Sequence, residues 1–144
     1  MNMALRNKFA QQYASTYVET AVSEATPHKL VAMLYEGAVK NLNLAKFFIE
    51  KNDFAKKSEH ANKALAILNS LRAGVDLEKG GEVAGNLYDL YDYCYRRVFE
   101  GASQNDAEIM QEISGLIAEV QASWEQMPDE VKYASKGQIE KIAP

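Results

Sequence analysis

Apolar side chains recur at three- and four-residue steps through most of residues 26 to 127, and no stretch alternates apolar with polar residues. Such spacing places apolar side chains on one face of an α-helix, whereas a half-buried strand needs strict alternation. The plainest run contains Ile109, Ile113, Leu116, Val120, Trp124 and Met127. The chain is therefore predicted to be all-α.

Capping signals and breaks divide this region into helices. Thr26-Pro27 predicts an N-cap followed by proline at the first helical position, and Asn105 with Glu108 resembles a capping box. Residues 51–53 form a short break, and residues 74–86, with four glycines, form the longest connection. The predicted helices are about 27–51, 53–73, 82–101 and 105–127.

Four helices of similar length joined by short links favour an antiparallel four-helix bundle. A length of 144 residues fits one domain. We expect residues 1–25 to be a mobile N-terminal arm, residues 26–127 to be the bundle, and residues 128–144 to be a short helix or tail.

Composition and charge exclude several functions. A net charge of −4 and a pI near 5.2 argue against nucleic acid or an anionic membrane as the partner. No stretch approaches the roughly 18 apolar residues that span a bilayer, and no signal peptide is evident. With a single cysteine, Cys94, a disulfide framework is excluded, and we expect a soluble cytoplasmic protein.

Cofactor and catalytic sites are also not expected. Neither His28 nor His60 follows a glutamate by three residues, so the di-iron motif of helical bundles is absent. Cys94 lies on an apolar stripe and is predicted to be a small buried residue. Asp92 stands four residues before Arg96, the spacing of a helix-surface ion pair. We expect no enzyme activity, no metal and no cofactor.

The stretch "NLYDLYDYCYRRVF" (86–99) carries an unusual density of tyrosine. On a helix, Tyr88, Tyr91, Tyr95 and Phe99 form one stripe beside a second stripe of Leu87, Leu90, Cys94 and Val98. Both stripes can belong to the core with hydroxyls at the surface. Alternatively, because Tyr is enriched at interfaces and other helices also carry surplus apolar residues, the aromatic stripe can line a groove for an amphipathic partner.

Several stretches together resemble the flagellin-specific export chaperones (FliS). They are "YASTYVETAVSEATPHKLVAMLYEGA" (13–38), "NKALAILNSLR" (62–72), "NLYDLYDYCYRRVFEGASQND" (86–106) and "SW" (123–124). The combination of "LVAMLYEGA" with "YRR" and a following "ND" is specific. One position departs from the pattern, since Ala102 stands where the family usually has asparagine.

The resemblance implies a cytosolic four-helix bundle that binds the disordered C-terminal segment of flagellin, prevents early polymerisation and aids delivery to the flagellar type III export apparatus. It implies an N-terminal arm, with Tyr13, that covers part of the site when empty. For Arg96 and Arg97 we expect a structural role, joining the third helix to the fourth near Asn105 and Asp106. The export gate and a flagellar regulator are further partners that the resemblance allows.

We hypothesise that the partner surface is lined by Ala64, Ile67, Leu71, Tyr88, Tyr91 and Tyr95. A client that folds on binding needs a long apolar surface of this kind. Two alternatives stay open at this point: a self-associating structural bundle whose extra apolar face forms a homodimer seam, and an enzyme or metal-binding bundle. The expected state is a monomer or weak dimer.

Overall fold

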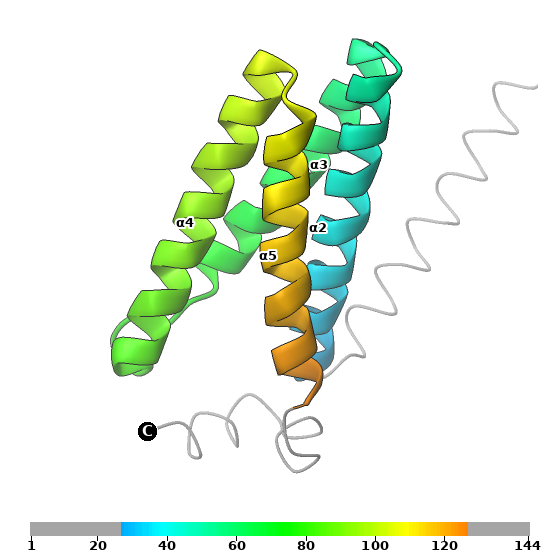
Figure 1. Ribbon diagram of the computed structural model, residues 1–144. Helices are drawn as coiled ribbons and strands as arrows, with labels where there is room; N and C mark the ends of the chain where they lie inside the picture. Colours follow the sequence, from blue (N-terminus) through cyan, green and yellow to red (C-terminus); the bar gives the residue numbers. More distant parts are fainter. Residues whose placement is uncertain (1–26, 127–144) are drawn as a thin grey trace, which may run out of the picture.

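The computed structural model describes residues 27 to 126, which form an up-down-up-down bundle of α-helices (Figure 1). The helices are α2 (Pro27–Glu50), α3 (Phe54–Ala73), α4 (Gly81–Gln104) and α5 (Ala107–Glu125). The predicted all-α bundle is confirmed. The predicted arm and tail lie outside the described residues.

Two helix starts follow the sequence signals. α2 begins at Pro27, as predicted, while the expected cap Thr26 lies outside the described residues. Asp53 caps α3, and its Oδ1 accepts a hydrogen bond of 3.2 Å from the backbone N–H of Lys56. Asn52, just before it, has φ 58°, a left-handed conformation that asparagine tolerates and that reverses the chain direction.

The junction between α4 and α5 differs by one residue from the prediction. Asn105 is the C-cap of α4 in the left-handed conformation (φ 53°, ψ 46°), and Asp106 is the N-cap of α5. The Asp106 carboxylate accepts hydrogen bonds from the backbone N–H groups of Glu108 and Ile109. The predicted N-cap role of Asn105 is wrong because its tolerance of positive φ lets it end α4, and the next carboxylate caps α5.

One apolar cluster fills the centre of the bundle. Its largest fully buried side chains are Tyr35, Leu42, Leu68, Cys94, Val98, Met110, Ile113 and Ile117. On α5 the core is centred on Ile113 and Ile117, while Leu116 and Val120 from the predicted stripe are only partly buried. This rotation follows from the packing of α5 mainly against α2. The predicted burial of Cys94 is confirmed.

Arg97 joins α4 to α5. Its guanidinium donates a hydrogen bond of 2.9 Å to Glu112 in α5 and another of 2.9 Å to Glu100 in α4. The hydroxyl of Tyr93 donates to the second carboxylate oxygen of Glu112 at 2.6 Å. Hydrogen bonds from Tyr93 and Arg97 hold the pKa of Glu112 below its usual range.

Arg96 does not take part in this connection. Its Nε lies 3.1 Å from Asp92, one turn earlier on the same helix, which confirms the ion pair predicted from their spacing. Of the two arginines predicted to join these helices near Asn105 and Asp106, Arg97 does so through Glu112, and Arg96 does not. Successive residues on a helix point about 100° apart, so only Arg97 faces α5.

α4 approaches α5 closely only near the turn between them. A Cβ atom on Gly101 would lie 2.8 Å from Cγ2 of Ile109, so glycine is required for this contact. Away from the turn the two helices diverge, and α4 packs mainly on α3 (Figure 1). The bundle is therefore opened at the end where α4 begins.

At the same end of the bundle, His28 of α2 and Trp124 of α5 keep these two helices in contact. The Nε2 of His28 donates to the carbonyl of Trp124 at 3.0 Å, and the indole Nε1 of Trp124 donates to the carbonyl of His28 at 2.9 Å. The two rings are stacked, with centroids 4.9 Å apart. These reciprocal contacts fix the start of α2 to the end of α5.

Replacing His28 should show how much this side-chain hydrogen bond stabilises the fold. His28→Ala removes the donor to a half-buried carbonyl and should lower the free energy of unfolding by about 1–3 kcal/mol. His28→Gln, whose amide can donate from a similar position, should lose clearly less. Denaturant unfolding of both variants measures this, and equal losses would show that the hydrogen bond contributes nothing.

Stability should also fall at alkaline pH because of Cys94. Burial raises the pKa of its thiol from 9.0 to about 12, so above pH 9 the unfolded chain loses a proton that the folded chain keeps. The stabilising contribution is complete below pH 9 and declines as pH rises. Between pH 8 and pH 10 the decline from this thiol should be about 1.4 kcal/mol.

The matched control is Cys94→Ala, which lacks a titrating group at this position. Its free energy of unfolding should fall less between pH 8 and pH 10 than that of the unaltered chain. Chemical denaturation at the two pH values gives both differences. An identical decline in the two proteins would contradict the assignment to Cys94.

Candidate partner-binding cavity

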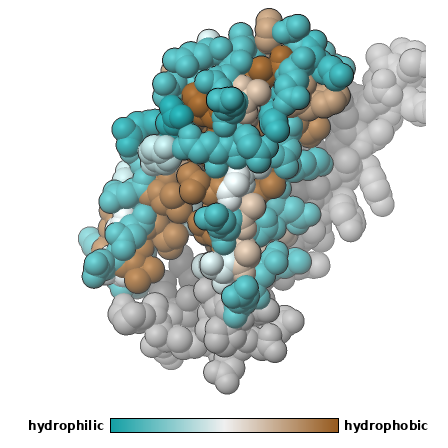
Figure 2. All heavy atoms as spheres, viewed as in Figure 1, coloured by the Kyte–Doolittle hydropathy of each residue, from teal (hydrophilic) through white to brown (hydrophobic). Residues whose placement is uncertain are grey.

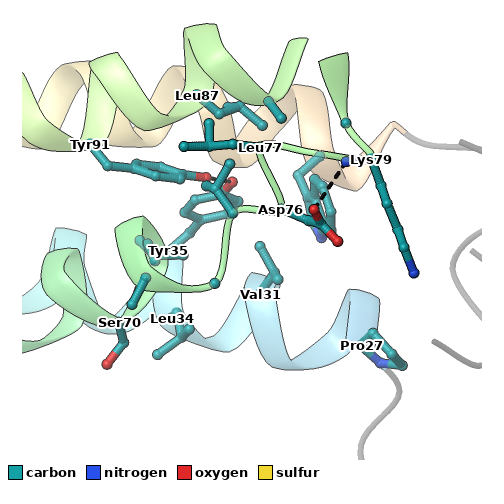
Figure 3. Close-up of a pocket in the computed structure, with 17 residues that line it drawn as sticks. Pro27, Val31, Leu34, Tyr35, Ser70, Asp76, Leu77, Lys79, Leu87 and Tyr91 are labelled. Atoms are coloured by element: carbon teal, nitrogen blue, oxygen red, sulfur yellow. Dashed lines mark hydrogen bonds between the residues drawn. The ribbon is translucent and has the colours of Figure 1, made fainter. Parts of the chain in front are cut away.

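A cavity of about 770 Å³ lies at the open end of the bundle, between the starts of α2 and α4 and the ends of α3 and α5 (Figure 3). Its lining is mostly aliphatic or aromatic. The residues are Pro27, Val31, Leu34, Tyr35, Ser70, Leu71, Ala73, Gly74, Val75, Asp76, Leu77, Lys79, Gly80, Ala84, Leu87, Tyr91 and Trp124. A volume of this size is within the range of binding pockets.

The loop between α3 and α4 forms one side of the cavity. The Asp76 carboxylate accepts hydrogen bonds from the backbone N–H groups of Glu78 and Lys79, at 3.1 and 3.0 Å, which folds the loop into a tight turn (Figure 3). The turn leaves Leu77 53% exposed beside the cavity. An aliphatic side chain in this position offers apolar surface to an incoming partner.

Two tyrosines from opposite helices meet in the cavity wall. The hydroxyl oxygens of Tyr35 in α2 and Tyr91 in α4 are 2.5 Å apart and hydrogen-bonded (Figure 3). Burial raises the pKa of both phenols, so both are neutral at physiological pH. The Trp124 ring packs edge-on against Tyr35, with centroids 6.0 Å apart. The part of the wall that Tyr35, Tyr91 and Trp124 form is therefore uncharged, and contacts between their rings and hydroxyls hold it in place.

The chemistry of this site suits binding of apolar groups. In residues 27–126, no group of three or more His, Cys, Asp or Glu side chains is placed to hold a metal ion. None of the helices in the same residues is long and apolar enough to cross a membrane. What the cavity provides is mostly apolar surface, with the neutral hydroxyls of Tyr35 and Tyr91 in its wall and Ser70, Asp76 and Lys79 also in its lining.

The residues hypothesised to line one partner surface are distributed over three places. Leu71 and Tyr91 line the cavity, although both are almost fully buried, whereas Ala64 is completely buried in the core. Ile67 faces α2, since its Cδ1 would be 3.1 Å from a Cβ atom added to Gly37. Of these four residues, only Leu71 and Tyr91 line the cavity.

The remaining tyrosines lie on another side of the bundle. The ring of Tyr95 lies 4.7 Å below the guanidinium carbon of Arg72 in α3, and Arg72 also pairs with Asp92 at 2.8 Å. Tyr88, two turns before Tyr95 on α4, shares its face. Tyr13 lies outside the described residues. Ile67 packs toward Gly37 of α2, and the Tyr95 ring packs against Arg72 of α3. That the two residues share a partner surface stays a prediction.

Sequence reasoning missed most of the cavity. Val31, Leu34, Tyr35, Leu87 and Trp124 line it, and none of them was assigned to the partner surface. Their positions along the helices were the signal that could have found them. In an antiparallel bundle, all five residues lie in the halves of their helices that meet at the same end. A divergence of α4 from α5 cannot be read from periodicity, so the cavity could not be located.

Comparison with known proteins gives the family of this chain. The family described as "Flagellar protein FliS" matches residues 9–131. The flagellar secretion chaperone FliS of Salmonella typhimurium is 42% identical over 122 residues, which cover 84% of this chain and 90% of the relative. The flagellar secretion chaperone FliSB of Pseudomonas aeruginosa is 36% identical, covering 82% of this chain and 94% of the relative.

A third relative, the flagellar secretion chaperone FliS of Vibrio cholerae, is 34% identical over 120 residues, covering 83% of this chain and 88% of its own length. The family match covers all of the described residues, including the elements that form the cavity. The chain belongs to the FliS family of flagellar proteins.

Proposed function

We propose that this protein is a flagellar export chaperone that binds the disordered C-terminal segment of newly made flagellin. Binding prevents premature polymerisation and aids delivery to the flagellar type III export apparatus. The observation that carries the proposal is the apolar cavity at the open end of the bundle. The names of the relatives, flagellar secretion chaperones, support the same class of function.

A disordered client needs more surface than the cavity alone. Segments that fold on binding bury roughly 1,000–3,000 Å² of surface. This burial offsets the several kcal/mol of free energy that ordering the segment costs. Figure 2 shows apolar side chains gathered between α4 and α5, next to the open end. Partly buried Leu90, Leu116 and Val120 come from these two helices. We infer that the client fills the cavity and continues along this strip.

The face with Tyr88 and Tyr95 supplies a second stretch of amphipathic surface in this proposal. Both residues are partly exposed, and Tyr95 is stacked under Arg72. Tyrosine suits a surface that is alternately covered and wet, since its ring packs against apolar groups while its hydroxyl tolerates water. An export gate or a flagellar regulator is a further partner that can use surfaces left uncovered by the client.

Leu77 provides a sharp test of the cavity because its exposure makes substitution compatible with folding. Leu77→Asp places a charge beside the apolar cavity and should weaken binding of the flagellin C-terminal segment at least about tenfold, since a carboxylate is costly to desolvate. Isothermal titration measures the affinity. The heat-capacity change of the unaltered chain should be large and negative because apolar surface is buried.

The matched control is Val83→Asp, at an exposed aliphatic residue on α4 that does not line the cavity. It should leave affinity within about twofold of the unaltered chain. Equal effects of the two substitutions would show that the client does not use the cavity. Absence of binding by the unaltered chain at micromolar concentration would refute the proposed client.

The proposed arm, residues 1–25 with Tyr13, covers part of the cavity in the empty protein. Pro27 lines the cavity, so the arm joins the bundle at this site. An arm that competes with the client for the cavity lowers the apparent affinity of the protein for the client. Tyr13→Ala should therefore raise affinity for the flagellin segment several-fold through faster association, measurable by stopped-flow mixing. Lower affinity would instead make Tyr13 part of the client-binding surface.

A further inference from the structure

The hydroxyls of Tyr35 and Tyr91 carry two O–H hydrogens, and the hydrogen bond between them uses only one. Within residues 27–126, neither hydroxyl forms a hydrogen bond with any other residue. One hydroxyl hydrogen in the cavity wall therefore has no protein acceptor among these residues. A polar hydrogen left in this position is a binding feature in a mostly apolar lining.

Burial favours Tyr91 as the tyrosine that has the spare hydrogen. Tyr35 has 0% of its surface exposed, whereas Tyr91 retains 3%. A fully buried donor without an acceptor is costly, so we assign the donated hydrogen to Tyr35 and the accepting oxygen to Tyr91. The hydrogen of Tyr91 then points away from Tyr35, at the place where both rings line the cavity (Figure 3).

We propose that the Tyr91 hydroxyl donates a hydrogen bond to the occupant of the cavity, and that the occupant presents one acceptor oxygen there. This inference rests on the proposed binding of the flagellin segment. The nearby lining includes the aliphatic side chains of Val31, Leu34 and Leu87. The matching peptide carries aliphatic side chains around a single oxygen, either a backbone carbonyl that its own helix does not use or a side-chain oxygen.

Two substitutions that each remove one oxygen separate the roles of the tyrosines. Tyr91→Phe removes the donor and leaves the acceptor of the client unpaired, so affinity for the flagellin C-terminal segment should fall about tenfold. Tyr35→Phe keeps the Tyr91 hydroxyl free to donate, so affinity should stay within about twofold. Isothermal titration of both variants with the same segment measures the asymmetry.

A double variant keeps the test decisive if Tyr91→Phe is unstable, because that substitution leaves the buried Tyr35 hydroxyl without its partner. Tyr35→Phe with Tyr91→Phe replaces both hydroxyls by apolar groups of the same shape, which is close to neutral for stability. This double variant should fold and bind about tenfold more weakly than the unaltered chain. Binding as tight as that of the unaltered chain would overturn the inference.

The outcomes also distinguish this inference from the proposed function. If the unaltered chain binds but Tyr91→Phe and Tyr35→Phe weaken binding equally, the donor assignment is wrong and the proposed function stands. If the unaltered chain does not bind, both are refuted. Removing side-chain oxygens of the segment one at a time locates the acceptor. If an altered segment binds the Tyr91→Phe variant and the unaltered chain with equal affinity, the acceptor is the side-chain oxygen that was removed. If every altered segment still binds the Tyr91→Phe variant more weakly, the acceptor is a backbone carbonyl.

Discussion

At the open end of the bundle, one buried side chain connects three helices. Tyr35 projects from α2, contacts the edge of Trp124 in α5 and hydrogen-bonds the hydroxyl of Tyr91 in α4. Trp124 is in turn fixed to the first turn of α2 through His28. Because α4 has diverged from α5 at this end, the phenol pair bridges the space that aliphatic packing would otherwise fill. The cavity depends on this bridge.

A cavity of this size in a small bundle costs stability, since its lining lacks the contacts of a close-packed core. The bundle offsets the cost elsewhere. At the opposite end, Gly101 lets α4 and α5 approach closely, and Arg97 joins them through Glu112. Proteins keep such loosely packed regions where a partner binds. The contrast between a closed end and an open end suits the proposed function, in which a client is held and later released.

The parts of the fold that could be predicted are those fixed by local chemistry. Helical periodicity, the break before Asp53 and the proline that starts α2 depend on a few neighbouring residues, and these predictions are confirmed. The N-cap assigned to Asn105 was wrong because two adjacent residues can both cap a helix, and only the backbone geometry decides between them.

The site was harder to predict because it depends on how far helices lie apart. Tyr91 and Leu71 were chosen for their apolar character and do line the cavity, but Ile67 faces α2 and Ala64 fills the core. A stripe on one helix does not reveal which neighbour covers it. Tyr35 was missed for the same reason, since a tyrosine within a mostly aliphatic helix gives no sign that its hydroxyl meets another from α4.

Trp124, the single tryptophan of the chain, lines the cavity and is partly exposed, so its fluorescence reports directly on occupancy. The decisive measurement is its emission spectrum during titration with a flagellin C-terminal segment that lacks tryptophan. The emission should shift to shorter wavelength, and the shift should saturate at the same concentration as the heat of binding. Heat of binding without any change in Trp124 emission would show that the client binds elsewhere and would contradict the account.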